Sequence, residues 1–157
     1  MKQNTLIAAI VCISLFFFCG NSWAQTPTAT LLAAKNAIEK NNTAYFDLYA
    51  KNDGSILSLY TEDACLLAPN TPPICGIKAL KKDFEDTFAA GKVKSGKFVT
   101  GNVYGDGNEY VTEEGTWQVF DPNGKLLDEG KYLKLWRKTK TGWKIFRDSF
   151  NSDHKTP

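Results

Sequence analysis

The sequence predicts an α+β domain in which three N-terminal helices pack on a curved, mainly antiparallel sheet. Apolar residues recur every three or four positions over residues 31–51, which indicates an amphipathic helix. From residue 97 onward, runs of branched and aromatic residues alternate with short turns that contain glycine. A curved sheet that wraps over a long helix makes a cone-shaped domain with a cavity inside, and we expect that arrangement here.

Residues 1–24 have the pattern of a secretory signal peptide. Lys2 gives a positive start, residues 6–18 form an apolar run, and Ser22-Trp23-Ala24 matches a small-x-small cleavage site. The apolar run is too short for a comfortable membrane span, which needs about 20 residues. We therefore expect export to the periplasm or the extracellular space, a mature chain that begins at Gln25, and no membrane partner after cleavage.

The remainder of the 157-residue chain is long enough for one domain with its own core. Residues 25–30 form a Thr/Pro linker, residues 31–153 form the expected domain, and residues 154–157 form a short tail. The formal charge of the whole chain at pH 7 is +2. A nucleic-acid partner is not expected, because the sequence lacks the clustered basic residues that such binding needs.

Three helices are expected before the sheet. The first covers residues 31–51, with Thr30 as its N-cap. The second is a short helix over residues 56–60, and the third covers residues 77–90, where Gly91 ends it. Within the first helix, Tyr45 and Tyr49 stand one turn apart. They either present their hydroxyls to a cavity or belong to the core with their hydroxyls at its rim.

Five strands are expected, of which the last four form an antiparallel meander. A short strand over residues 64–68 comes first, between the second and third helices. The meander is divided by glycine-containing turns. Its strands are expected over residues 98–104, 110–120, 125–137 and 143–150.

The cysteines leave two alternatives open. Cys12 and Cys19 depart with the predicted signal peptide, so Cys65 and Cys75 remain on either side of the Pro-rich turn 69–73. If the segments that flank this turn pair as strands, the two cysteines can form a disulfide, which an oxidising compartment preserves. The alternative is two buried free thiols, since cross-strand neighbours often lack the required geometry.

Metal and cofactor chemistry is not expected. His154, near the tail, is the only histidine. One histidine and two remaining cysteines argue against a zinc site and against a histidine-activated nucleophile. The glycine-containing turns do not stand between a strand and a helix, so they are not nucleotide-binding loops. We therefore predict neither a metal ion nor another cofactor.

Asp148 is the sharpest chemical hint in the sequence. Side chains alternate between the two faces of a strand, so Asp148 is expected on one face with Phe146 and Phe150. Apolar rings disfavour the charged form of a carboxylate and raise its pKa. The alternative interpretation is a carboxylate near the strand end that is solvated or paired with a nearby Lys or Arg.

Glu113 is a second carboxylate on a mainly apolar strand face, which it shares with Trp117. It is expected to pair with Lys131 or Arg147 on a neighbouring strand, because cross-strand ion pairs are ordinary in sheets. A place for the Glu113 side chain on a pocket wall is the second interpretation.

Several strings, taken with the order of the elements, carry a family resemblance. They are residues 59–64 (LYTEDA), 72–80 (PPICGIKAL), 130–133 (GKYL), 142–145 (GWKI) and 147–153 (RDSFNSD), together with Trp136. The chain resembles the SnoaL-like, ketosteroid-isomerase-like branch of the nuclear-transport-factor-two-like superfamily over residues 31–153. The resemblance implies a cavity between the first helix and the concave face of the sheet, and homodimers that form through the outer face.

The resemblance also implies where catalytic groups would lie. In members that isomerise steroids, a helix tyrosine and a late-strand acid form an oxyanion hole, and an aspartate at the end of the first strand abstracts the proton. Tyr45 matches the tyrosine. Ala68-Pro69 stand at the base position, and Lys131 or Tyr132 stands at the late-strand acid, so the sequence departs from the pattern at both. Asp148 matches a position that faces the pocket.

These observations predict a secreted single-domain protein with an apolar pocket for a small hydrophobic molecule. Asp148 and Tyr45 would carry acid/base chemistry of an isomerase- or hydro-lyase-like kind. The pocket walls are expected to include Tyr49, Glu113, Trp117, Phe146 and Phe150. The alternative function is a non-catalytic ligand-binding module or a dimeric interaction module.

Overall fold

The computed structural model describes residues 28–154. The predicted signal peptide, its cleavage site after Ala24, the first three residues of the linker and the last three residues of the tail lie outside this range. Within residues 28–154, no helix combines the length and the apolar character that crossing a membrane requires.

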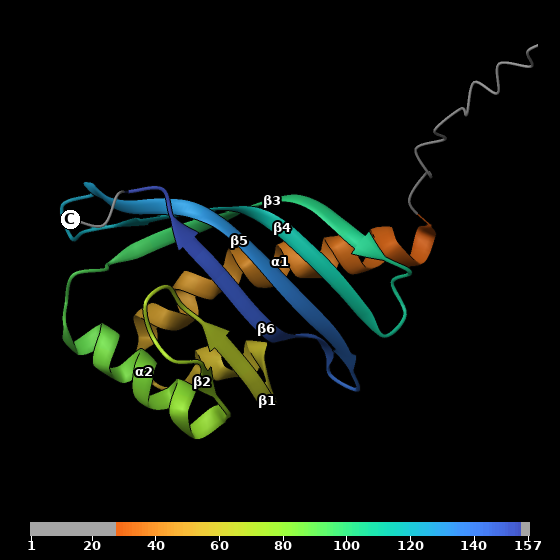
Figure 1. The fold of residues 1–157 in the computed structure, drawn as a ribbon, viewed down its shortest axis with the longest axis horizontal. Helices are drawn as coiled ribbons and strands as arrows, with labels where there is room; N and C mark the ends of the chain where they lie inside the picture. The colour runs from red at the N-terminus through yellow and green to blue at the C-terminus, as the bar shows by residue number, and fades with distance from the viewer. Residues whose placement is uncertain (1–27, 155–157) are drawn as a thin grey trace, which may run out of the picture.

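Helix α1, Ala29–Lys51, runs along the concave side of a curved sheet (Figure 1). Its N-cap is Thr28, whose hydroxyl accepts a hydrogen bond from the Leu31 backbone N–H at 3.1 Å. The predicted cap at Thr30 is therefore wrong, and the Thr30 hydroxyl instead donates to the Asp106 carbonyl at 2.9 Å. One face of α1 is buried against the sheet, and its buried residues are Ala34, Ile38, Asn42, Tyr45 and Tyr49.

Two further helical segments follow α1, but only one of them is an α-helix. The segment η1, Ser55–Leu59, is a 3₁₀ helix that begins after Gly54, which has a φ of 81°. The second α-helix, α2, covers Ile77–Ala89 and begins after Gly76, which has a φ of 84°. The prediction of three helices therefore needs correction at the middle one, since a run of five residues suits a 3₁₀ turn.

Within residues 28–154, the strands form one mixed six-stranded sheet in the order β2-β1-β6-β5-β4-β3. Their bounds are Tyr60–Leu67 for β1, Ile74–Cys75 for β2, Ser95–Gly105 for β3, Tyr110–Phe120 for β4, Leu126–Thr139 for β5 and Gly142–Ser152 for β6. Strands β3 to β6 form the predicted antiparallel meander. Strand β1 lies parallel to β6 at the end of the meander.

Strand β1 begins at Tyr60, whereas the sequence predicted a helix up to residue 60 and a strand only from residue 64. The earlier start has a consequence for the interior. Tyr60 is 4% exposed and becomes part of the buried core beside β6. A residue expected at the end of the second helix thus lies next to Asp148.

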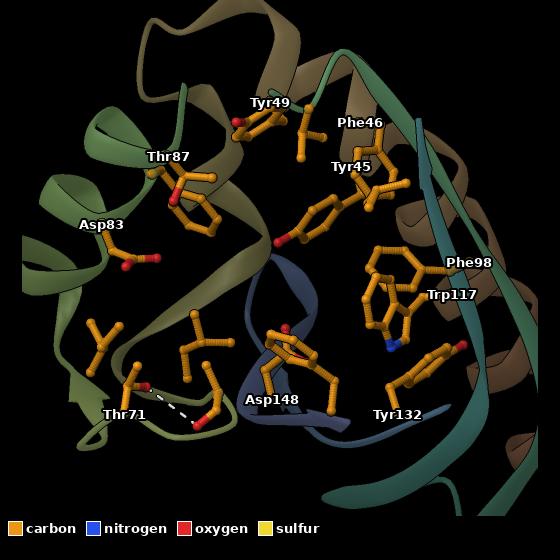
Figure 2. A pocket seen from close by; sticks show the side chains of 17 residues that line it. Tyr45, Phe46, Tyr49, Thr71, Asp83, Thr87, Phe98, Trp117, Tyr132 and Asp148 are labelled. Atoms are coloured by element: carbon orange, nitrogen blue, oxygen red, sulfur yellow. Dashed lines mark hydrogen bonds between the residues drawn. The ribbon is translucent and has the colours of Figure 1, made fainter. Parts of the chain in front are cut away.

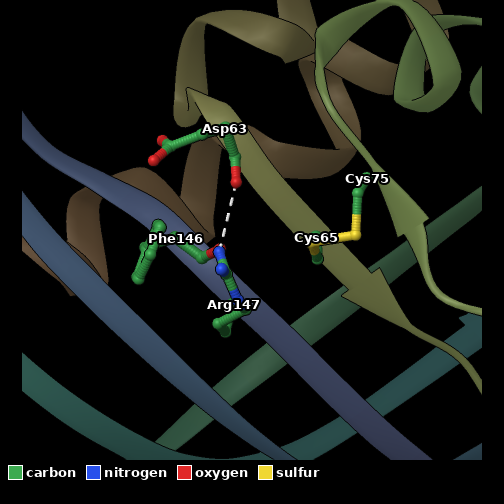
Figure 3. The surroundings of a disulfide bond; sticks show 5 residues. All are labelled: Asp63, Cys65, Cys75, Phe146 and Arg147. Atoms are coloured by element: carbon green, nitrogen blue, oxygen red, sulfur yellow. Dashed lines mark hydrogen bonds between the residues drawn. A yellow bond between two sulfur atoms is a disulfide. The ribbon is translucent and has the colours of Figure 1, made fainter.

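The two remaining cysteines face each other across the short antiparallel pair β1–β2. Cys65 and Cys75 are register partners, and a disulfide bond joins them (Figure 3). Of the two alternatives left open by the sequence, the structure adopts the disulfide. The bond fixes both ends of the connection between β1 and β2, which carries Thr71 on the cavity wall.

A β-bulge in β6 decides which side chains face inward. Trp136 of β5 pairs with Ile145 of β6. The preceding residue of β5, Leu135, pairs with Arg147, so Phe146 is an extra residue on β6. Ile145 before the bulge and Asp148 after it are both buried, with exposed fractions of 0% and 4%. The simple alternation that placed Phe146 beside Asp148 is therefore wrong.

Candidate ligand-binding cavity

A cavity of about 300 Å³ lies between α1, α2 and the concave face of the sheet (Figure 2). Aromatic and aliphatic side chains make most of its wall, among them Phe46, Leu66, Phe84, Phe98, Trp117 and Phe150. Thr71 and Thr87 are solvent-exposed wall residues, so they mark the open side. The volume lies at the lower end of the roughly 300–1,000 Å³ that is usual for small-molecule sites.

The cavity brings together most of the side chains that the sequence proposed for it. Tyr45 and Tyr49 come from α1, and Trp117, Asp148 and Phe150 come from the sheet. Figure 2 shows Asp148 below Tyr45, between Asp83 on the α2 side and Tyr132 on the other side.

Phe146 does not line the cavity, because the bulge turns it to the outer side of the sheet. Its ring lies 3.7 Å from the guanidinium carbon of Arg147 and 4.5 Å from that of Arg137. The ring also packs against Tyr110 at a centroid distance of 5.9 Å. The prediction of Phe146 as a wall residue is wrong for this reason.

Asp148 ends a chain of three hydrogen-bonded side chains. The Tyr60 hydroxyl donates to Asp148 Oδ2 at 3.0 Å, and the Tyr45 and Tyr60 hydroxyl oxygens are 3.0 Å apart. Each hydroxyl has one proton to donate. Since that of Tyr60 is used on the carboxylate, Tyr45 donates to Tyr60. Among residues 28–154, Asp148 Oδ1 has no hydrogen-bond donor, so this oxygen is left for a ligand.

Burial is the main influence on the pKa values of these three hydrogen-bonded side chains. Burial raises the pKa of Asp148, while the charge of Lys134 and the hydrogen bond from Tyr60 lower it and the charge of Glu113 raises it further. Burial also raises the pKa of Tyr60 and the pKa of Tyr45, so both phenols stay protonated at neutral pH. Among these three side chains, the carboxyl of Asp148 is therefore the one that titrates.

A buried lysine lies beside Asp148. Lys134 is 0% exposed and is the register partner of Glu113 on β4 and of Asp148 on β6, so the three charges form a row across three adjacent strands. Burial lowers the pKa of Lys134, and the two carboxylates oppose that effect. Lys134 is therefore the buried cation that partly compensates two buried anions.

Aromatic rings separate the Lys134 ammonium from the cavity. Its Nζ atom lies 3.4 Å from the Phe98 ring centroid, 4.6 Å from that of Tyr132 and 5.4 Å from that of Tyr45, which are cation–π distances. Its one hydrogen bond within the described chain goes to Asn42 Oδ1 at 3.4 Å. Lys134 is not a wall residue, so it acts on the cavity through its charge.

Glu113 is fully buried below the cavity wall and accepts hydrogen bonds from four side chains. Oε1 accepts from Asn42 Nδ2 and Tyr132 Oη at 2.6 Å and from Thr100 Oγ1 at 2.7 Å, and Oε2 accepts from Trp136 Nε1 at 2.8 Å. Both oxygens of this carboxylate therefore have hydrogen-bond donors from the protein itself. Glu113 therefore anchors α1, β3 and β5 to β4, and its prediction as a wall residue is wrong.

The expected ion pairs of Glu113 are also wrong, because both candidate partners lie on the outer face of the sheet. Lys131 pairs with Asp153. Arg147 donates to the Asp63 carbonyl at 3.1 Å (Figure 3). Ordinary alternation places Lys131 on the opposite face from Tyr132 along β5, and Arg147 on the opposite face from Asp148 along β6.

A second carboxylate, Asp83 of α2, lies at the other side of the cavity, and Figure 2 shows it pointing towards the interior. Burial raises the pKa of Asp83, and the charge of Asp86 adds to that effect. Within residues 28–154, no side chain donates a hydrogen bond to Asp83. The Tyr49 ring also lines the cavity, while its buried hydroxyl has no hydrogen-bond partner within the described chain.

Three residues in or beside the cavity were not predicted, although two of them left a signal in the sequence. Lys134 alternates with Tyr132 and Trp136 along β5, and that pattern places it on the inner face. Asp83 stands next to Phe84 and three residues after Leu80, on the apolar stripe of α2. Tyr60 left no such signal, because the parallel neighbour that buries it is distant in sequence.

Comparison with known proteins supports the fold. No protein-family model and no curated protein matches this sequence. A ketosteroid isomerase-like protein from Erwinia carotovora has a similar structure, with a TM-score of 0.63 at 18% identity over 82% of this chain and 99% of that chain. A nuclear transport factor 2-like protein from Salmonella enterica gives a TM-score of 0.61 at 17% identity over 80% of this chain and 95% of that chain.

A third similar structure is described both as NTF2-like and as having a cystatin-like fold. An NTF2-like protein with a cystatin-like fold from Novosphingobium aromaticivorans gives a TM-score of 0.63 at 16% identity over 80% of this chain and 86% of that chain. The chain therefore has the NTF2-like fold, as its sequence predicted. Because one fold serves many activities, the function has to be argued from the cavity itself.

Proposed function

We propose that this chain, with its NTF2-like fold, binds a small aromatic or alicyclic molecule in the cavity and exchanges a proton with it through Asp148. One observation carries the proposal. The Asp148 carboxyl is buried at the end of an apolar cavity, where Tyr60 holds one oxygen and no donor within residues 28–154 holds the other. A few convergent polar groups in an apolar cavity are typical of small-molecule sites.

The proposed chemistry is proton transfer at a carbon next to a carbonyl group. A general base works best when its pKa lies near the operating pH, and the burial that raises the pKa of Asp148 moves it in that direction. Tyr60 orients the carboxylate through Oδ2. Tyr45, expected to donate to the ligand, donates to Tyr60 and so acts as a positioning residue.

The test uses 2-tetralone, a small bicyclic ketone with acidic protons next to its carbonyl. The wild-type protein is incubated with the ketone in D₂O, and proton NMR follows the loss of the α-proton signals. We expect exchange about 10²-fold faster or more than in acetate buffer of equal carboxylate concentration, since a positioned base contributes about 10²–10⁴-fold. Failure of the ketone to bind, read from the NMR signals of Trp117, would contradict the proposal.

A non-catalytic binding module is the second candidate function. Ala68 lines the cavity where the resemblance would place the proton-abstracting aspartate, so a dedicated base is missing at that position. Binding of 2-tetralone without any acceleration of exchange would favour this function over the first. The same experiment therefore separates the two.

Export and homodimer formation belong to the same proposal. The Cys65–Cys75 disulfide supports export, because disulfides persist in oxidising compartments. We expect the intact mass of the exported protein to correspond to a chain that begins at Gln25. The outer face of the sheet carries exposed apolar side chains, Val99, Tyr104 and Leu133, which would contact a second copy. Light scattering at increasing protein concentration tests that association.

A further inference from the structure

The charges on the cavity wall are all of one sign. Among the residues that line the cavity, two are acidic, Asp83 and Asp148, and none is Lys, Arg or His. An anionic ligand would bring a third negative charge into a largely apolar enclosure, which is costly without a cationic partner. The wall therefore disfavours carboxylates and phosphates.

The two carboxylates differ in how far their charges are compensated. The buried ammonium of Lys134 lowers the proton affinity of Asp148 from behind the aromatic wall. On α2, Lys81 pairs with Glu85 and Lys82 pairs with Asp86, but no basic side chain within residues 28–154 pairs with Asp83. Asp83 is thus the uncompensated charge of the cavity.

Tyr49 contributes its ring, and not its hydroxyl, to the cavity wall. The residue is 6% exposed and lines the cavity, while its hydroxyl oxygen is fully buried and makes no hydrogen bond within the described chain. Asp83 is therefore the polar group on the α2 side that a ligand in the cavity can reach.

Aromatic faces complete the environment of this end of the cavity. The rings of Tyr49 and Phe84 lie 6.5 Å apart at an angle of 69°, and both line the cavity. Ammonium groups bind well where aromatic faces stand beside a carboxylate. The cavity thus offers an anion, Asp83, and two aromatic rings to a ligand.

We infer that the cavity selects amphipathic amines, with an aromatic or alicyclic body against the apolar wall and the ammonium group beside Asp83. The inference rests on the proposed function, because it presupposes that a small molecule occupies the cavity. It adds a recognition site at the α2 side, apart from the proton-exchanging carboxyl of Asp148. The amine would compensate the charge of Asp83.

The experiment compares three probes of matched shape: 2-(2-naphthyl)ethylamine, 2-(2-naphthyl)ethanol and 2-naphthylacetate. Affinity for the full chain is measured by isothermal titration at pH 7. We expect the amine to bind about tenfold more tightly than the alcohol, as one charge-assisted hydrogen bond allows, and the acetate to bind most weakly. Asp83→Asn should remove the preference for the amine and leave the affinity for the alcohol within about twofold.

Asp86→Asn is the matched control, because Asp86 is an acid on the same helix that pairs with Lys82 and does not line the cavity. It should leave all three affinities unchanged. Binding of the alcohol by Asp83→Asn shows that this variant is folded.

The outcomes separate this inference from the proposed function. If none of the three probes binds, the proposed function fails and the inference fails with it. If the alcohol binds and the amine binds no more tightly, the proposed function stands and the inference is overturned. An equal loss of amine affinity in Asp83→Asn and Asp86→Asn would also overturn it, because the effect would then be general surface charge.

Discussion

Replacing Lys134 with methionine is expected to lower the free energy of unfolding by about 3 kcal/mol at pH 7, as is typical when one member of a buried charge group is removed. Lys134 is 0% exposed and lies between Glu113 and Asp148 in the row across β4, β5 and β6. Without it, Asp148 becomes a buried anion with a single hydrogen bond. Urea unfolding followed by circular dichroism measures the loss.

Lys131→Met is the matched control for this variant. Lys131 lies on the same strand but on the outer face, in an exposed pair with Asp153, so its loss should cost no more than about 1 kcal/mol. Adding Asp148→Asn to Lys134→Met should restore much of the lost stability, because the unpaired anion is then gone. Equal effects of Lys134→Met and Lys131→Met would show that the buried row has no electrostatic role.

Asp148→Asn is expected to reduce proton exchange into 2-tetralone by about 10²–10⁴-fold, the usual contribution of a positioned general base. The variant keeps the size of the side chain and an oxygen that can accept from Tyr60. The affinity for the ketone should therefore remain within a fewfold of the wild type. Exchange that persists in this variant would show that Asp148 is not the proton acceptor.

The same variant has a pH signature in stability. Because the folded-state pKa of Asp148 is raised, the unfolded chain releases this proton at lower pH than the folded chain does. Wild-type stability therefore falls as pH rises from the unfolded-state pKa of about 3.9 to the raised folded-state pKa. Asp148→Asn should match the wild type at low pH and be at least as stable above this window, as urea curves at several pH values would show.

Asp153→Asn provides a control of opposite sign. Lys131 lowers the pKa of the exposed Asp153, so the stability from that pair is present above the unfolded-state pKa and is lost as pH falls. Its pH profile should therefore diverge from the wild type at high pH as a loss of stability, where Asp148→Asn shows none. Profiles of the same sign for both variants would contradict a raised pKa at Asp148.

Most of the fold could be predicted because local patterns determine it. The meander β3–β6 follows from alternation and turn residues, and α1 follows from its apolar stripe. The parallel pairing of β1 with β6 and the bulge at Phe146 could not be predicted. The parallel pairing depends on contacts between segments far apart in sequence. The bulge is a single inserted residue that reverses the face of every later side chain of β6, and simple alternation does not reveal it.

The site was predicted where a residue's own strand or helix decided its environment, and missed where another element did. Asp148 was correctly connected with an apolar cavity, although the reasoning used Phe146, which faces outward. Lys134 was missed because lysine is almost always exposed, and only Glu113 and Asp148 on the adjacent strands make its burial tolerable. Tyr60 was missed because its partner is on β6.

The pKa of Asp148 tests the central claim most directly. It can be measured by carboxyl-detected NMR titration of the folded protein, first alone and then with 2-(2-naphthyl)ethanol. We predict a value clearly above the ordinary aspartate value of about 3.9 that shifts when the ligand is added. An ordinary value that no ligand changes would contradict the claim that Asp148 is the proton-exchanging group of a ligand-binding cavity.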